Sequence, residues 1–204
     1  MSDARPENAT AADAKARLEA GNQRYVADRS ERPHGDAARR GELATGQRPF
    51  ATILACADSR VAPELVFDQG LGDLFVVRVA GNIVDDVVLG SIEYASAHLG
   101  VNLIVVMGHE SCGAVAAAVE SFDVDGPATH SHIDALIEAV RPAVKAAREA
   151  GVDDLVAASV RENARRVADA IRESQPIIAA LAGEGVEVRP ACYDLASGEV
   201  DWLD

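Results

Sequence analysis

The sequence contains no apolar run that approaches the roughly 20 residues needed for a membrane-spanning helix. Residues 1–6 also lack a basic start followed by an apolar segment, so no secretory signal is evident. These two absences predict a cytoplasmic protein that has no membrane partner.

Cationic side chains are scarce as well. Lys15 and Lys145 are the only lysines, and the formal net charge is −14. With no basic stripe to neutralise phosphates, binding to nucleic acid is excluded as a working hypothesis. A charge so far from zero favours solubility. It would also fit a salt-rich cytoplasm, with compositional drift as the alternative.

Cysteines and aromatic residues are few. Three cysteines are too few for a disulfide scaffold. Aromatic residues make up 4% of the chain, so the core must be built from aliphatic side chains. With 204 residues that are 49% hydrophobic, the simplest interpretation is one domain over residues 1–204. We expect a loose start over 1–9, an N-terminal helical arm over 10–45 and an α/β core over 46–204 that carries the functional site.

Strand and helix patterns alternate along the chain, which favours a parallel α/β sheet with right-handed crossovers. Strands are predicted at 50–55, 74–80, 101–107 and 186–195, and helical segments at 10–28, 36–43, 63–68, 85–99, 112–120, 132–150, 153–174 and 176–182. The expected fold is therefore a mostly parallel sheet of four to five strands flanked by helices. The helix over 10–28 has a thin apolar stripe, so we expect it to pack on a partner subunit.

Two short segments carry the chemistry: Cys56-Ala57-Asp58-Ser59-Arg60 and His109-Glu110-Ser111-Cys112-Gly113. Each follows a predicted buried strand. In a parallel sheet both would emerge at the carboxyl edge, where open α/β sheets bind ligands. Two thiolates and one imidazole suit zinc. Three protein ligands leave a fourth position free, as in catalytic zinc sites, where a bound water can become a hydroxide nucleophile.

Two neighbouring features complete this interpretation. Asp58 and Arg60 lie two residues apart in an extended segment and so share one face. A surface ion pair is the simpler alternative, but their closeness to Cys56 favours a functional pair in which Arg60 keeps Asp58 ionised. Cys192 is left over, and we interpret it as a small buried side chain in the last strand.

The pattern Cys56-x-Asp58-x-Arg60, followed some fifty residues later by His109-x-x-Cys112-Gly113, resembles the β-class carbonic anhydrases. Further stretches share the resemblance: Asp58-Ser59-Arg60-Val61, Phe75-Val76-Val77-Arg78, Ser91-Ile92-Glu93-Tyr94-Ala95 and Gly108-His109. It covers most of the chain and weakens across residues 121–185.

The resemblance implies one zinc ion per subunit, held by Cys56, His109 and Cys112. A hydroxide as fourth ligand would hydrate carbon dioxide reversibly to bicarbonate and a proton. Asp58 and Arg60 match the family's catalytic dyad, which orients that hydroxide. If the ion pair opened, Asp58 could instead occupy the fourth position and stop catalysis, as in some members at lower pH.

The resemblance also implies a substrate pocket and a partner. The expected substrate-binding residues are Gln47, Phe75, Ala80, Tyr94 and Gly113. Some of them would come from a neighbouring subunit, because the family builds its sites at the interface of a homodimer, which can assemble further into a dimer-based tetramer. Phe75 and Tyr94 could equally be core aromatics. Ile53 stands where one subclass has the tryptophan of a regulatory bicarbonate site, so that site is expected to be absent.

Two other functions stay open at this point. The same zinc site could hydrolyse carbonyl sulfide or carbon disulfide, since hydroxide attacks either kind of linear molecule. A zinc-stabilised binding module without turnover is the third possibility, although such a module would have no need of Asp58 and Arg60.

Overall fold

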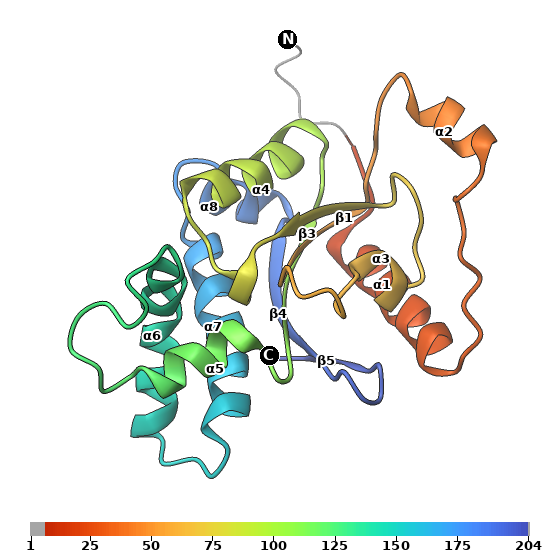
Figure 1. The fold of residues 1–204 in the computed structure, drawn as a ribbon. Coiled ribbons are helices and arrows are strands. Elements are labelled where there is room, and N and C mark those ends of the chain that lie inside the picture. The colour runs from red at the N-terminus through yellow and green to blue at the C-terminus, as the bar shows by residue number, and fades with distance from the viewer. Residues whose placement is uncertain (1–6, 204) are drawn as a thin grey trace.

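The computed structural model describes residues 7–203 and contains one five-stranded sheet in the order β2-β1-β3-β4-β5 (Figure 1). The strands are β1 (Ala51–Ala55), β2 (Leu74–Arg78), β3 (Leu103–His109), β4 (Glu187–Tyr193) and β5 (Val200–Trp202). The first four run parallel, and β5 is antiparallel to β4. The predicted fold class, a mostly parallel sheet flanked by helices, is confirmed.

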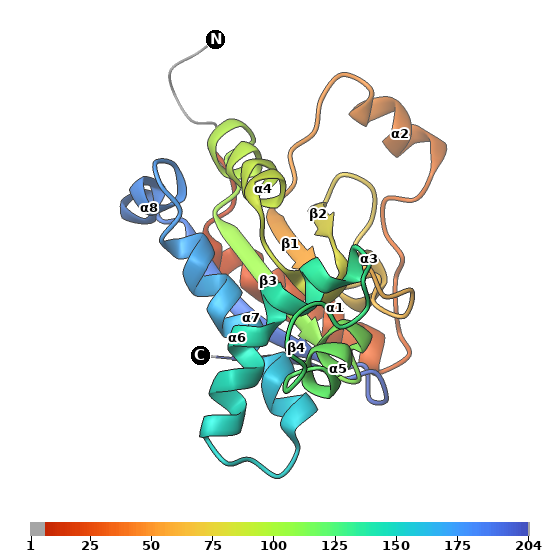
Figure 2. The ribbon, with the colours of Figure 1, turned by 60° about the vertical axis from the view of Figure 1, so that its left-hand side comes forward.

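Helices cover both faces of the sheet, as Figures 1 and 2 show. They are α1 (Ala11–Val26), α2 (Ala37–Leu43), α3 (Pro63–Val66), α4 (Asp86–His98), α5 (Gly113–Glu120), α6 (Ile133–Glu149), α7 (Leu155–Arg172) and α8 (Ile178–Leu181), with 3-10 turns η1 (Ala80–Asn82) and η2 (Ala182–Glu184). Helices α4 to α8 pack on the face that carries Leu54, Ile104 and Val106. Helices α1 and α3 pack on the face that carries Ile53 and Val105. The core is aliphatic on both sides, as the composition requires.

Helix α1 packs on the sheet of its own chain, and its expected packing on a partner subunit stays a prediction. Leu18 is fully buried there, and small residues let the backbone approach closely. A Cβ added at Gly21 would lie only 1.8 Å from the carbonyl oxygen of Phe67. When the backbone of a helix lies this close to its neighbour, a narrow row of small side chains is enough to bury that side of the helix. The thin apolar stripe therefore reflects small side chains that let the helix pack closely within its own chain.

The N-terminal segment also differs from expectation where the structure describes it. Residues 1–6 lie outside the described part, but residues 7–9 are held in place. Asn8 Nδ2 donates to the carbonyl oxygens of Pro49 and Leu99, and Asn102 Nδ2 donates to the carbonyl of Ala9. Residues 7–9 are thus anchored to the core and are not a loose start.

Strand β5 was not predicted. It has only three residues, which is too short for a period of two to be visible in sequence. A turn precedes it, in which Asp194 accepts hydrogen bonds from the backbone of Ala196 and Ser197, and Gly198 adopts a φ of 81°. This tight turn lets the chain fold back on β4.

The parallel strands bring the polar segments to one edge. β1 ends just before Cys56, β2 runs towards the turn η1, and β3 ends at His109. β1 lies between β2 and β3, so these three carboxyl ends are neighbours. No helix within residues 7–203 is both long and apolar enough to cross a bilayer.

Candidate metal centre

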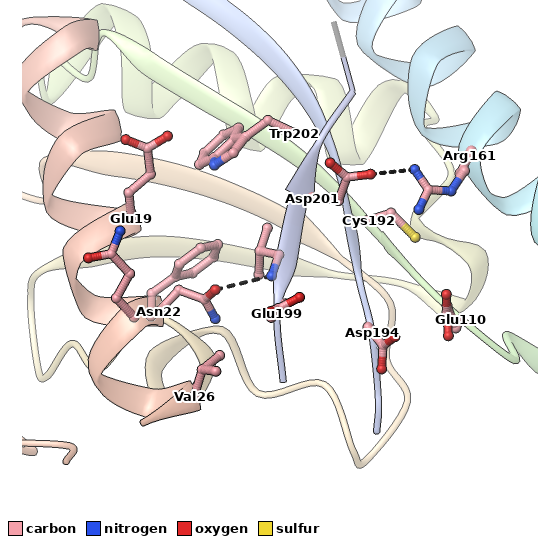
Figure 3. A pocket seen from close by; sticks show the side chains of 13 residues that line it. Glu19, Asn22, Val26, Glu110, Arg161, Cys192, Asp194, Glu199, Asp201 and Trp202 are labelled. Carbon is pink, nitrogen blue, oxygen red and sulfur yellow. Dashed lines mark hydrogen bonds and ion pairs between the residues drawn. The ribbon is translucent and has the colours of Figure 1, made fainter. Parts of the chain in front are cut away.

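A cavity of about 610 Å³ lies between α1 and β5 (Figure 3). Five carboxylate side chains line it and only one arginine does: Glu19, Glu110, Asp194, Glu199, Asp201 and Arg161. Arg161 Nη1 is already paired with Asp201 Oδ2 at 2.6 Å. The cavity brings together no set of residues typical of catalysis.

Cys192 also lines this cavity, and it is the cysteine that the sequence left over. It is buried in β4, as expected. Burial raises the pKa of its thiol to about 11, so little thiolate exists at neutral pH. The structure gives Cys192 the properties of a packing residue.

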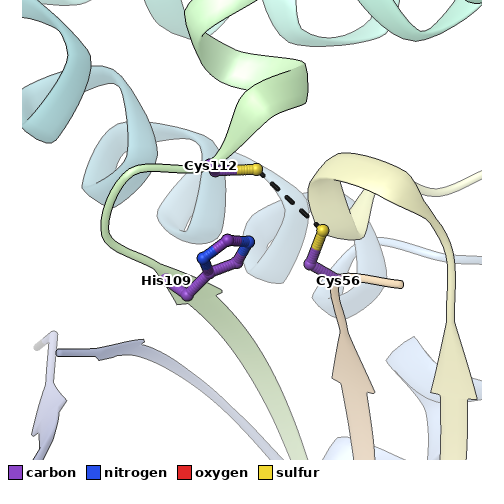
Figure 4. Close-up of side chains that lie close together, drawn as sticks. All are labelled: Cys56, His109 and Cys112. Atoms are coloured by element: carbon purple, nitrogen blue, oxygen red, sulfur yellow. Dashed lines mark hydrogen bonds between the residues drawn. The ribbon is translucent and has the colours of Figure 1, made fainter. Parts of the chain in front are cut away.

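The three residues predicted as metal ligands converge at the carboxyl edge of the sheet (Figure 4). Cys56 directly follows β1, His109 is the last residue of β3, and Cys112 caps the N-terminus of α5. Their ligand atoms all lie within 4.8 Å of one another, and the three residues are buried. This spacing allows one ion to contact all three side chains.

His109 presents one nitrogen to the cluster. Its Nδ1 lies 2.9 Å from the carbonyl oxygen of Glu110, so the Nδ1–H donates to that oxygen and leaves a lone pair on Nε2. Nε2 is buried and has no hydrogen-bond partner among residues 7–203. An orphaned buried acceptor costs about 1–3 kcal/mol. A cation at this position would satisfy it, and the fixed tautomer is the one that a metal ligand requires.

The two sulfurs lie 4.0 Å apart, within reach of a hydrogen bond between them. The hydrogen bond from Cys112 lowers the pKa of the Cys56 thiol to about 4, while the same bond and burial raise the pKa of Cys112. The backbone N–H of Gly81 also donates to Cys56 Sγ at 3.3 Å. Cys56 is therefore the thiol that loses its proton more readily, and binding of a dication would release the protons that remain on the two sulfurs. Two sulfurs and one imidazole fit zinc.

Asp58 and Arg60 form the predicted ion pair. Arg60 Nε donates to Asp58 Oδ1 at 2.9 Å, and Nη2 donates to Oδ2 at 2.7 Å. This two-point bond holds the pKa of the Asp58 carboxyl well below its usual range, although burial acts against it. Asp58 Oδ2 also lies 4.0 Å from His109 Nε2. The ionised carboxylate therefore sits directly beside the cluster.

The expected substrate-binding residues divide into two groups. Ala80 and Gly113 lie at the cluster, since Ala80 precedes the Gly81 amide that bonds to Cys56 and Gly113 follows Cys112. Gly113 is exposed, and a Cβ added there would meet no atom within 4 Å. The backbone here is open to a small ligand.

Gln47, Phe75 and Tyr94 do not gather there in the same chain. Phe75 lies opposite Thr52, four residues before Cys56, which at about 3.3 Å per residue is about 13 Å along the strand. Gln47 precedes the amino end of β1 and is exposed. Tyr94 is 48% exposed, and its ring centroid lies 6.4 Å from that of Phe75. Phe75 and Tyr94 therefore form a separate, partly exposed pair along β2 and α4.

Arg78 contacts the backbone of the first motif, a role that the sequence alone did not suggest. It ends β2, and its Nε donates to the carbonyl of Cys56 at 3.0 Å while Nη2 donates to that of Asp58 at 2.6 Å. One side chain thus braces the backbone on both sides of Ala57. The only sequence signal for this contact was an arginine near the end of the strand predicted at 74–80.

Replacing Cys192 with alanine is expected to leave both metal content and activity unchanged, because this thiol lies in the cavity beside β5 and not in the cluster. Metal analysis and a rate measurement on Cys192→Ala check this. A loss of half the bound metal would assign Cys192 a part in the metal centre.

Comparisons with known proteins agree with this geometry. A family model described as carbonic anhydrase matches residues 51–200. Carbonic anhydrase 2 of Mycobacterium tuberculosis is 44% identical over 181 residues, which cover 89% of this chain and 87% of the relative. A carbonic anhydrase of Mycolicibacterium smegmatis is 43% identical over 187 residues and covers 90% of this chain and 89% of its own length.

Solved structures show the same similarity. A tetrameric β-carbonic anhydrase from Sordaria macrospora superposes with a TM-score of 0.73 at 26% identity, covering 90% of this chain and 93% of its own. The Coccomyxa β-carbonic anhydrase in complex with acetazolamide gives a TM-score of 0.70 at 28% identity, covering 89% and 82%.

Proposed function

This chain belongs to the β-class carbonic anhydrases, and from that premise we propose that it hydrates carbon dioxide reversibly to bicarbonate and a proton at a zinc ion held by Cys56, His109 and Cys112. The observation that carries the proposal is the convergence of two sulfurs and one unpartnered imidazole nitrogen within 4.8 Å. A bound zinc ion would supply a Lewis acid that makes a nucleophile from water near neutral pH.

Asp58 is proposed to orient that nucleophile. Because Arg60 keeps its carboxylate ionised, Asp58 can accept a hydrogen bond at Oδ2 but cannot donate one. A hydrogen bond donated by the nucleophile to Asp58 would fix the direction of the oxygen lone pair, so that it faces the carbon of the substrate; the proton stays on the nucleophile. Arg60 contributes by orientation, since both of its bonds to Asp58 fix the plane of the carboxylate.

The substrate pocket is proposed to need a second copy of this chain. Carbon dioxide is small and apolar, so its pocket requires apolar walls. Ala80 supplies part of a wall at the cluster, whereas Phe75 lies about 13 Å along the sheet from Cys56 of its own chain. Tyr94 lies beside Phe75, and Gln47 precedes the amino end of β1. β2 is an edge strand whose side chains are half-buried, so it offers a surface against which a partner could pack. A homodimer would let one protomer complete the pocket of the other.

The experiment is a pair of steady-state assays on the zinc-loaded protein. Hydration is followed with a pH indicator, and hydrolysis of carbonyl sulfide by release of hydrogen sulfide. We expect rapid hydration that stops when a chelator removes the metal. Negligible hydration beside fast sulfide release would transfer the proposal to the sulfide substrate, and no metal-dependent turnover with either would leave a binding module.

A further inference from the structure

We propose that Asn163, a side chain on α7 that belongs to neither motif, is a positioning residue for the ligand Cys56. It acts through the backbone of Gly81. This inference rests on the zinc site proposed above and adds to it a residue that is distant in sequence.

Asn163 is, with Ser159, one of two polar residues on the otherwise apolar buried face of α7. On α7, Val160, Ala164, Val167 and Ala168 are buried against the sheet, and Asn163 is buried among them with 2% of its surface exposed. A buried amide needs a partner. Its Nδ2 donates to the carbonyl oxygen of Gly81 at 2.9 Å, across 82 positions of sequence.

The turn at Gly81 and Asn82, to which Asn163 is hydrogen-bonded, has an unfavourable backbone conformation. Gly81 has a φ of 72° and Asn82 a φ of 42°, so two successive residues lie in the left-handed region. Such a conformation costs a non-glycine residue roughly 1–2 kcal/mol. A Cβ at Gly81 would lie 3.2 Å from the Cβ of Ala114, so the turn packs tightly against α5. Contacts with the surrounding structure must hold this conformation, and the hydrogen bond from the Asn163 amide is one of them.

The same turn contacts the metal centre. The N–H of Gly81 points to Cys56 Sγ at 3.3 Å, while the carbonyl of Gly81 accepts from Asn163. The two contacts are on opposite sides of one residue, so the Asn163 bond restricts the rotation that would turn the N–H away from the sulfur. An N–H donated to a thiolate orients the sulfur and draws off part of its negative charge. Groups that hydrogen-bond to metal ligands affect metal binding strongly, since their loss typically lowers metal affinity by about 10–100-fold.

The alternative is that Asn163 only satisfies a buried carbonyl and stabilises the fold. Asn22 on α1 provides a matched control, because it is also a buried asparagine whose Nδ2 donates to backbone carbonyls, those of Val66 and Gly198, on the far face of the sheet. Asn163→Leu and Asn22→Leu remove the same kind of bond with little change in volume. Both should lower the melting temperature, but only one removes a contact to the turn beside Cys56.

We expect Asn163→Leu to bind zinc about 10-fold more weakly in chelator competition and to shift the thiolate-to-cobalt charge-transfer band of the Co²⁺-substituted protein. Asn22→Leu should match the wild type in both. Equal zinc affinity and equal spectra in the two variants would overturn the inference. If the wild type itself binds no zinc, the proposed function has failed, which is a different result.

A measurement on the wild type keeps the inference testable should Asn163→Leu not fold. In protein loaded with ¹¹³Cd, a hydrogen bond from the Gly81 amide to Cys56 should transmit a scalar coupling between the amide proton and the metal. Absence of that coupling, in a protein that holds cadmium through its cysteines, would remove the contact on which the role of Asn163 depends.

Discussion

Alanine in place of Cys56, His109 or Cys112 is expected to lower the zinc content from one per chain to less than about 0.1 after dialysis against a chelator. The reason is that the binding free energy of a site with so few protein ligands is shared among them, and much of the roughly 10–16 kcal/mol seen for structural zinc sites depends on each. Zinc analysis by atomic emission measures the result, with circular dichroism as the check on folding.

Cys192→Ala is the matched control for the two cysteine variants, since it removes an equally buried thiol from a different part of the fold. Its zinc content should equal that of the wild type. Undiminished zinc in Cys56→Ala and Cys112→Ala would contradict the ligand assignment, whatever their activity.

Asp58→Asn is expected to keep zinc and to lower kcat/KM for carbon dioxide hydration by about 100-fold, the size of loss found when a reacting group is misplaced by about 1 Å. The carboxamide has nearly the same shape, but it no longer offers two acceptor oxygens both to Arg60 and to the nucleophile. Stopped-flow rates together with zinc analysis separate this effect from loss of metal. A variant that retains more than half of the wild-type rate would contradict the role assigned to Asp58.

The pH dependence follows from the direction of the Asp58 shift. Its pKa is depressed in the folded protein, so the carboxylate stays ionised above its ordinary value of about 3.9 and protonates only below it. Asp58 should therefore add no inflection to the rate profile between pH 5 and 9. Arg60→Gln would let this pKa rise towards about 3.9, which still leaves Asp58 charged at pH 7. A lower rate in Arg60→Gln would then report the lost orientation of the Asp58 carboxylate, since its charge is unchanged.

Much of the sheet could be predicted because buried parallel strands consist of short runs of aliphatic residues. Each of the four strands predicted in sequence lies within two residues of the observed ends of β1 to β4. The ligand cluster was predictable for a related reason: Cys56 and His109 lie where strands end, and parallel strands end at a common edge. The Asp58–Arg60 pair was predicted from the alternation of an extended segment. The pairing is confirmed, but its reason was wrong, because residues 59 and 60 form a turn in which the Arg60 N–H donates to Asp58 Oδ1.

What could not be predicted depends on contacts between distant segments. The small residues of α1 looked like a weak apolar stripe, because sequence does not show that Gly21 allows contact with Phe67. The bond from Asn163 to Gly81 joins residues far apart in the chain, and a helix pattern alone presents Asn163 as a defect in an apolar face. The positions of Gln47, Phe75 and Tyr94 relative to a partner's cluster also stay a prediction.

X-ray absorption at the zinc edge of the native protein tests the metal centre most directly. We predict one zinc per chain bound through two sulfurs and one imidazole, with a light atom as the remaining neighbour. A sulfur count other than two, or a protein that retains no zinc, would contradict the site on which the proposed chemistry depends.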